Sequence, residues 1–277
     1  MHHLALEEFL RSALLEDIGG GDVTTDACIA SEKQSRAYFI AKESGVVCGL
    51  QVAEQVFLLV DPTLVFTPLV KEGALVGNGM QIAEIQGSAA GILKGERLAL
   101  NLLQRMSAIA TKTAKAVDEV ANTGAKICDT RKTTPLMRQL EKYAVRCGGG
   151  QNHRFGLYDG VLIKDNHIVA AGGITAAIDK ARAHVPHTLK IEVEVQNLTQ
   201  VEEALNARAG IIMLDNMDLC EMKQAVEKIA GRALVEASGN MDRRSLKEVA
   251  DTGVDFISIG ALTHSVLALD ISLKFEI

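Results

Sequence analysis

The stretch TLKIEVEVQNLTQVEEALNARAGIIMLDNMDLCEMKQAVEKIAGRALVEASGN, residues 188–240, decides the fold. It holds three short runs that are rich in aliphatic residues, IEVEV, IIMLDN and ALVEAS, with helical apolar spacing between them. Each intervening helix is expected to end at a glycine, which suits a left-handed cap. Strands that alternate with helices in this way predict right-handed βαβ units and a parallel sheet.

The same alternation of strands and helices continues on both sides of this stretch, with further predicted strands at residues 125–132, 160–167 and 255–262. Each of the six predicted strands ends in polar or small residues, which are Arg131 and Lys132, Lys164 and Asp165, Glu194, Asp215 and Asn216, Ser238 and Gly239, and Gly260. Such a series predicts the C-terminal rim of an α/β barrel, where barrels place their chemistry. Six strands fall short of eight, so the barrel is incomplete or has further strands that the pattern does not reveal. A doubly wound open sheet is the alternative.

The N-terminal part has a different pattern. Residues 4–19 predict a helix, and residues 36–50 and 64–87 show the alternation and glycine turns of antiparallel strands. We therefore predict a second, α+β sandwich domain. Residues 70–93 resemble the hammerhead of biotinyl or lipoyl carriers, but no lysine lies between methionines at a hairpin tip, so no carrier role is expected. A helix over 95–124 connects the two domains.

We place the domains at residues 1–110 and 111–267, with a tail, 268–277, that could pack back on the first domain.

The 277 residues are 48% hydrophobic, which is enough to fill a core. A net charge of −6 and an aromatic content of 4% without tryptophan argue against binding to nucleic acid or to anionic lipid. No apolar run approaches the ~18 residues that span a bilayer. Five scattered cysteines without a CxxC pair argue against a disulfide framework and a zinc site, and they fit a cytoplasmic location.

Positive charge is concentrated between residues 131 and 164, where seven Lys and Arg residues face two acids. Three of the seven, spaced four apart, are expected on a solvated helix face: Arg138, Lys142 and Arg146. The other four lie at strand ends or after a glycine loop, and such groups grip carboxylates and phosphates: Arg131, Lys132, Arg154 and Lys164. The glycines at 148–150 could bend sharply and deliver His153 and Arg154 into the rim.

Acidic residues in the strands suggest a second part of the site. In IEVEV the strand geometry sends Glu192 and Glu194 to one face, and Asp215 ends the next strand. Glu194 and Asp215 could surround a Mg²⁺ ion or sugar hydroxyls, and an ion pair with Lys164 is the alternative. After the last two strands, small residues could offer backbone N–H groups to a phosphate or could serve close helix packing; they are Ser238, Gly239, Gly260 and Ala261.

Several ordered motifs resemble the quinolinate phosphoribosyltransferase family, namely EDIGGGDVTT, DTRKTTP, GGGQNHRFGLYDGVLIKDNH, IEVEV, LDNM, EASG and ISIGALTHS. The resemblance runs from residue 16 to the last predicted strand. It implies an open, seven-stranded α/β barrel. It also implies that quinolinate and phosphoribosyl pyrophosphate are converted to nicotinate mononucleotide, pyrophosphate and CO2, with Mg²⁺, in de novo NAD synthesis.

The resemblance also implies roles for individual residues. Quinolinate would be bound by Arg131, His153, Arg154 and Lys164, with Lys132 shared between the acid and the pyrophosphate. Glu194 and Asp215 would face the ribose and its Mg²⁺, and together with Lys132 and Lys164 they are the expected catalytic residues. The remaining substrate contacts would come from Thr130, Ser238, Gly239, Asn240, Gly260 and Ala261. Arg97 would reach the site of a neighbouring subunit, which implies a homodimer, with assembly into a hexamer left open.

One position departs from the family pattern, because Leu136 stands where a glycine is common after the proline of RKTTP. Other functions remain as alternatives at this point. A Schiff-base aldolase or lyase would use Lys164 as its nucleophile. A molybdenum-linked relative or a nucleotide-sensing protein would bind phosphates and release no CO2.

Overall fold

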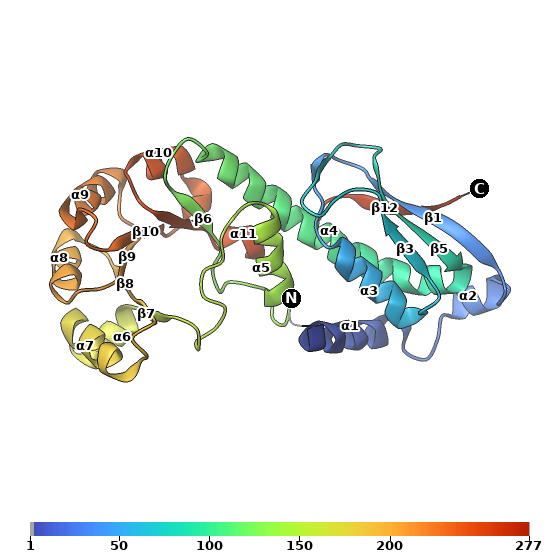
Figure 1. Cartoon of the computed structure of the whole chain (residues 1–277), viewed down its shortest axis with the longest axis horizontal. Coiled ribbons are helices and arrows are strands. Elements are labelled where there is room, and N and C mark those ends of the chain that lie inside the picture. The colour runs from blue at the N-terminus through green and yellow to red at the C-terminus, as the bar shows by residue number, and fades with distance from the viewer. Residues whose placement is uncertain (1–2, 277) are drawn as a thin grey trace. The chain divides into compact units, whose positions relative to one another are not determined.

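The computed structural model describes residues 3–276, and the chain divides into two compact units (Figure 1). The first, which we call the antiparallel unit, comprises Met1–Ala114, Thr134–Gly149 and Ser265–Ile277. The second, the barrel unit, comprises Lys115–Thr133 and Gly150–His264. The N-terminal antiparallel domain and the C-terminal open barrel that the sequence predicts are both confirmed.

The antiparallel unit is built on a sheet with the order β12-β1-β5-β3, which are Ile271–Phe275, Gln34–Ala41, Gln81–Ser88 and Val65–Pro68. Alternate residues of β1 are fully buried, because a strand sends successive side chains to opposite faces. One of them, Phe39, contacts Phe57 and Phe66 at ring-centroid distances of 6.0 and 5.7 Å. A small second sheet pairs β2 (Gly45–Val46) with β4 (Leu75–Val76).

Four helices and most of a fifth complete this unit: α1 (His3–Ile18), α2 (Val23–Cys28), α3 (Leu50–Val60), α5 (Arg138–Cys147) and α4 (Ala89–Glu119), whose residues 115–119 belong to the barrel unit. The expectation that α5 presents a solvated cationic face is wrong for Lys142, which is fully buried. Its neighbours Glu141 and Ala144 are also buried, so α5 is covered on more than one side. Charge spacing alone could not reveal this second covered face.

The barrel unit contains six parallel strands in the order β6-β11-β10-β9-β8-β7. Their bounds are Lys126–Cys128, Phe256–Ser258, Leu234–Ser238, Ile211–Asp215, Ile191–Val195 and Val161–Ile163. From β7 to β11 each strand pairs with the next in the chain, and β11 then pairs with β6, so the sheet curls in one direction without the reversal of a doubly wound fold. Gln151 adds a parallel bridge to Cys128 on the free edge of β6. The described residues thus form six barrel strands, one fewer than the seven that the resemblance implies.

Helices cover the outer side of the curled sheet (Figure 1): α6 (Asp165–Ala171), α7 (Ile174–His184), α8 (Leu198–Asn206), α9 (Leu219–Ile229) and α10 (Leu246–Asp251). A short 3₁₀ turn (Met241–Arg243) and α11 (Ala261–His264) follow β10 and β11. No helix within residues 3–276 is both long enough and apolar enough to cross a membrane.

Candidate active site

The sheet register places the predicted rim residues at one edge of the barrel unit. Asp215 is the Cα partner of Ser238 at the ends of β9 and β10. Lys164 follows the last residue of β7, and Gly260 lies two residues after the end of β11. Because all these strands are parallel, their carboxyl ends point the same way, and the loops after them form one surface.

An ion pair joins two rim residues from adjacent strands. The Lys164 Nζ atom donates to Glu194 Oε2 at 2.7 Å, and the Glu194 side chain is 12% exposed. This is the ion pair that the sequence left as the alternative to a metal or ribose role for Glu194. A lysine held in this position has its ammonium group fixed at the rim instead of moving freely in solvent.

The loops after β9 and β10 have unusual backbone conformations. Asn216 and Asn240 have φ angles of 57° and 50°, and Asn240 Nδ2 donates to Asn216 Oδ1 at 3.1 Å. Gly239, between them in space, has φ 96°, and an added Cβ would lie 2.3 Å from Asn216 Oδ1. Only glycine fits this close approach and this φ angle without strain.

The loop after β6 is anchored to the loop after β11. The Thr263 hydroxyl donates to the carbonyl oxygen of Lys132 at 2.8 Å, and Lys132 N–H donates to Thr130 Oγ1 at 3.0 Å. A Cβ added at Gly260 would lie 2.8 Å from Lys132 Cδ. Lys132 therefore passes directly over Gly260, the predicted phosphate-binding glycine.

A cavity of about 460 Å³ lies inside the barrel unit, and its walls include His153, Arg154, Glu192 and Glu236. This volume suits a small organic ligand. The Arg154 guanidinium donates to Gly160 O at 3.0 Å, and burial, followed by repulsion from the nearby Arg131, lowers its pKa. Two predicted quinolinate ligands, His153 and Arg154, thus line one cavity. Arg131, a third, lies close enough to Arg154 to lower its pKa.

The cavity also contains a buried pair of carboxyl groups. Glu192 and Glu236 are 4% and 3% exposed, and the His153 Nε2 atom lies 3.0 Å from Glu192 Oε2 and 3.6 Å from Glu236 Oε2. The His153 Nδ1 atom accepts the Arg154 backbone N–H at 2.7 Å, so the imidazole proton lies on Nε2, facing the acids. The two Oε1 atoms have no hydrogen-bond partner within the described part of the chain.

Electrostatics make this pair hold a proton near neutral pH. Burial, and then repulsion from the Glu192 carboxylate, raises the pKa of Glu236 to about 7, against the opposing effects of His153 and Lys164. Two like charges in a buried place cannot both ionise cheaply. The floor of the cavity therefore carries less negative charge than the count of its carboxyl groups suggests.

His153 is held in place by a residue that the sequence did not single out. Asp129 is fully buried, and its two carboxylate oxygens accept the His153 backbone N–H at 2.9 Å and the Asn152 Nδ2–H at 2.5 Å. Glu236 was missed as well. The signal for Glu236 is an acid inside an apolar strand, which is the same signal that pointed to Glu192.

The structure does not bring all the predicted residues into the cavity. Lys164, Glu194 and Asp215 are absent from its lining. Arg97 is exposed on α4, in the antiparallel unit. Glu194 and Asp215 offer oxygen donors at neighbouring strand ends, and two carboxylates with substrate phosphates fit what Mg²⁺ prefers.

Comparisons with known proteins identify relatives over the whole chain. Residues 22–107 match the family described as "Quinolinate phosphoribosyl transferase, N-terminal domain", and residues 109–274 match "Quinolinate phosphoribosyl transferase, C-terminal domain". A Bacillus subtilis relative, "Probable nicotinate-nucleotide pyrophosphorylase [carboxylating]", is 46% identical over 99% of this chain and 94% of its own length. A relative from Oryza sativa, "Nicotinate-nucleotide pyrophosphorylase [carboxylating], chloroplastic", is 46% identical over 98% of this chain and 78% of its own length. The crystal structure of NadC from Streptococcus pyogenes has a TM-score of 0.95 at 43% identity, covering 99% of this chain and 97% of that one.

Proposed function

The chain belongs to the quinolinate phosphoribosyltransferase family, and from this premise we propose that residues 111–267 form its catalytic domain, with the rim and the cavity of the barrel as the active site. The reaction is phosphoribosyl transfer from phosphoribosyl pyrophosphate to quinolinate with loss of CO2, which gives nicotinate mononucleotide and pyrophosphate. The observation that carries the site proposal is that five motif residues lie at or just after the carboxyl ends of parallel strands in one sheet: Lys164, Glu194, Asp215, Ser238 and Gly260.

Quinolinate binding is assigned to the cationic residues. Arg131 and Arg154 clamp the two carboxylates, and Arg97 from a neighbouring subunit of a homodimer adds a third guanidinium. Paired guanidinium groups bind carboxylates at two points and fix the orientation of the ring. His153 directs its Nε2 proton at the acid pair and its ring Nδ1 accepts the Arg154 backbone N–H, so its role is to hold the acid pair and to position Arg154. Holding the ring nitrogen against ribose C1 lowers the barrier by positioning alone.

The rim is assigned to the phosphoribosyl donor. Ser238, Gly239, Asn240, Gly260 and Ala261 offer backbone and side-chain donors to phosphate, and Thr130 fixes the loop from which Lys132 reaches the pyrophosphate. As the C1–O bond breaks, positive charge develops on the ribose, and Glu194 and Asp215 stabilise it. Glu194 and Asp215 would also hold Mg²⁺, which supplies charge neutralisation to the pyrophosphate.

After transfer, the ring nitrogen is quaternary, and its positive charge stabilises the electron pair left on the adjacent ring carbon when the C–C bond breaks and CO2 departs. A proton from solvent then adds to that carbon. This chemistry requires no covalent bond to the enzyme. Lys164, held by Glu194, acts as a fixed cation, in contrast to the nucleophile that an aldolase would need. We place the enzyme in the cytoplasm because its cysteine content suits a reducing compartment.

The test measures labelled CO2 released from carboxyl-labelled quinolinate with and without phosphoribosyl pyrophosphate. Release that depends on the donor supports the proposal, and its absence would favour a phosphate-binding protein without turnover. Lys164→Met should lower kcat by about 100-fold or more, whereas Lys180→Met, an exposed lysine on α7, should not. Borohydride with quinolinate should leave Lys164 unlabelled, and labelling would instead support a Schiff base.

The assignment of Arg97 to a neighbouring subunit has its own test. Arg97→Ala should abolish activity, and mixing it with Lys164→Met subunits under conditions of subunit exchange should restore part of it. Each mixed dimer then contains one site with both wild-type residues. If exchange is verified and no activity returns, Arg97 serves its own chain.

A further inference from the structure

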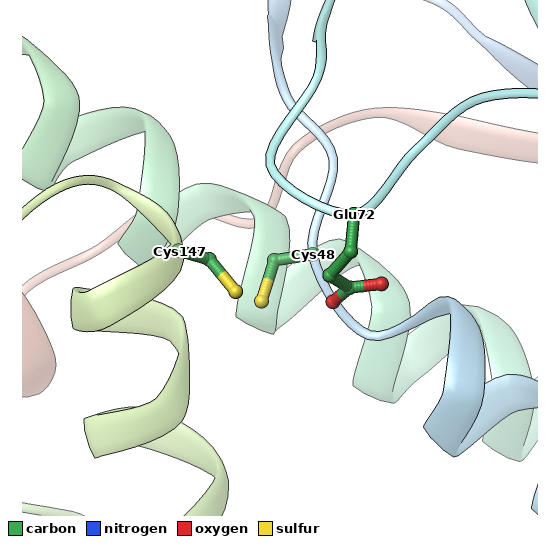
Figure 2. Close-up of side chains that lie close together, drawn as sticks. All are labelled: Cys48, Glu72 and Cys147. Atoms are coloured by element: carbon green, nitrogen blue, oxygen red, sulfur yellow. The ribbon is translucent and has the colours of Figure 1, made fainter.

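We propose that Cys48 and Cys147 are a reversible thiol–disulfide pair, a modification site in the antiparallel unit that is separate from the residues assigned to catalysis. The two cysteines are 99 positions apart in the sequence, yet Figure 2 shows their sulfur atoms pointing toward one another. The Sγ atoms and a Glu72 carboxylate oxygen all lie within 4.8 Å of one another. The scattered cysteine pattern gave no indication of this meeting.

Both cysteines are attached to the same helix, so their proximity is a fixed feature of the unit. The Cys48 backbone N–H donates to Ser107 Oγ at 3.0 Å, and the Ser107 hydroxyl lies 3.2 Å from the Cys48 carbonyl oxygen. Cys147 is the last residue of α5, and it is followed by Gly148, where an added Cβ would lie 2.4 Å from Ala110 O. Ser107 and Ala110 are one turn apart on α4. Backbone contacts with α4 therefore hold the two sulfur atoms close together, and the Cys147 side chain is half-buried.

The hydrogen bonds of Glu72 favour a pair of thiols over a metal site in this cluster. Its Oε1 and Oε2 atoms accept the backbone N–H groups of Gly49 and Leu50, at the start of α3. The carboxylate is therefore engaged at a helix N-terminus, where anions are stabilised, and it is oriented for that role. It also lies within 4.8 Å of both sulfur atoms, while the Cys48 sulfur faces the Cys147 sulfur (Figure 2).

The two thiols differ in burial and in acidity, and a two-step oxidation requires both differences. Cys48 is fully buried, whereas Cys147 is partly exposed. Burial raises the pKa of Cys48, and the hydrogen bond with Cys48 lowers the pKa of Cys147. Reactive cysteines are partly exposed and have a lowered pKa. Cys147 is therefore the attacking thiolate, and Cys48 is the resolving thiol.

The oxidant is a peroxide, and the reaction balances in two steps. The Cys147 thiolate attacks one peroxide oxygen, so that an S–O bond forms, the O–O bond breaks and hydroxide leaves to become water. Cys48 then attacks the sulfenic acid sulfur, so that the S–S bond forms, the S–O bond breaks and a second water leaves with the Cys48 proton. The two thiols lose two electrons and the peroxide gains them. A thiol reductant reverses the change.

The experiment uses the full-length protein, reduced and then treated with hydrogen peroxide. The intact mass should fall by about 2 Da, and peptide mapping should find the Cys48 and Cys147 peptides joined until dithiothreitol is added. Cys147→Ser should slow the oxidation at least tenfold. Cys48→Ser should stop the reaction at a sulfenic acid on Cys147 that dimedone labels. The matched control, Cys220→Ser, changes an exposed cysteine on α9 and should leave the rate unaltered.

Two results would overturn the proposal. One is oxidation of the exposed Cys28 and Cys220 while Cys48 and Cys147 stay reduced. The other is stoichiometric zinc in the freshly purified protein, measured by atomic emission and lost in Cys147→Ser, which would make the cluster a metal site. The mapping of the wild-type protein decides the matter even if a variant fails to fold. No readout depends on turnover, so failure here and failure of the proposed active site are distinguishable.

Discussion

Replacing Glu236 by glutamine should remove a pH-dependent loss of stability. Glu236 is 3% exposed, and its pKa is raised from an ordinary value of 4.5 to about 7 by burial and then by the Glu192 carboxylate. Between those two pH values the folded protein binds more protons than the unfolded chain does. The free energy of unfolding therefore falls as the pH rises through this window, and the stability contribution is fully present only below about pH 4.5.

The magnitude follows from the shift. The rise in the pKa of Glu236 from 4.5 to about 7 corresponds to a free-energy difference on the order of 3 kcal/mol. The group is almost completely buried, so solvent screening does not reduce this value much. The amide of Glu236→Gln has nearly the shape of the protonated acid and has no charge to gain. The variant should match the wild type near pH 4.5 and should be about 3 kcal/mol more stable at pH 8.

Urea unfolding at half-unit pH steps from 4.5 to 8 measures the difference between the two proteins. Glu227→Gln, at an exposed position of α9, is the control and should give a flat difference curve. A flat curve for Glu236→Gln as well would refute the raised pKa. A difference of the opposite sign would show that Glu236 is ionised and stabilised throughout, which would make the His153 contact a true ion pair.

Three further substitutions test separate parts of the structure. Arg105→Ala removes the guanidinium group whose Nη2–H donates to the fully buried Glu141 carboxylate at 2.6 Å. Because the buried charge then loses this partner, the free energy of unfolding measured in urea should fall by about 3 kcal/mol. Gly239→Ala combines a positive φ with a backbone clash and should lower activity about tenfold or more, whereas Gly172→Ala, at φ 92° with nothing within 4 Å, should not. Leu136 has a left-handed φ of 64° and is 89% exposed. Leu136→Gly should raise the free energy of unfolding by about 0.5 kcal/mol, because the relief of backbone strain slightly exceeds the entropy cost of glycine.

Periodicity in the sequence was sufficient to predict the barrel. The six strands found at residues 126–258 are the six that the aliphatic runs predicted. The expected glycine cap is wrong for α8, where the left-handed residue is Arg208 and Gly210 has no positive φ, and α9 is capped by the left-handed Ala230 just before Gly231. The single bridge at Gln151 could not be predicted, because no apolar run marks it. Leu136 also shows the limit of a motif, since the turn keeps a left-handed residue there although the usual glycine is missing.

The rim residues could be predicted because they follow strands, and strand ends are visible in sequence. The relation between Lys164 and Glu194 was open, because two residues 30 positions apart meet only through the pairing of β7 with β8. The meeting of Cys48 with Cys147 was not predictable at all. It depends on the packing of a loop and a helix end against α4, and no local pattern records such packing.

A count of the charged residues in the sequence leads to a wrong estimate of the net charge of the site. The excess of cations between residues 131 and 164 suggested a strongly positive site, yet the cavity that holds His153 and Arg154 also holds two carboxyl groups. Each buried acid lies two residues before a rim residue on its own strand, Glu192 before Glu194 and Glu236 before Ser238, so the strand geometry turns both toward the barrel interior. Because one proton is held by this pair up to about pH 7, the net charge of the cavity is set by protonation and changes with pH.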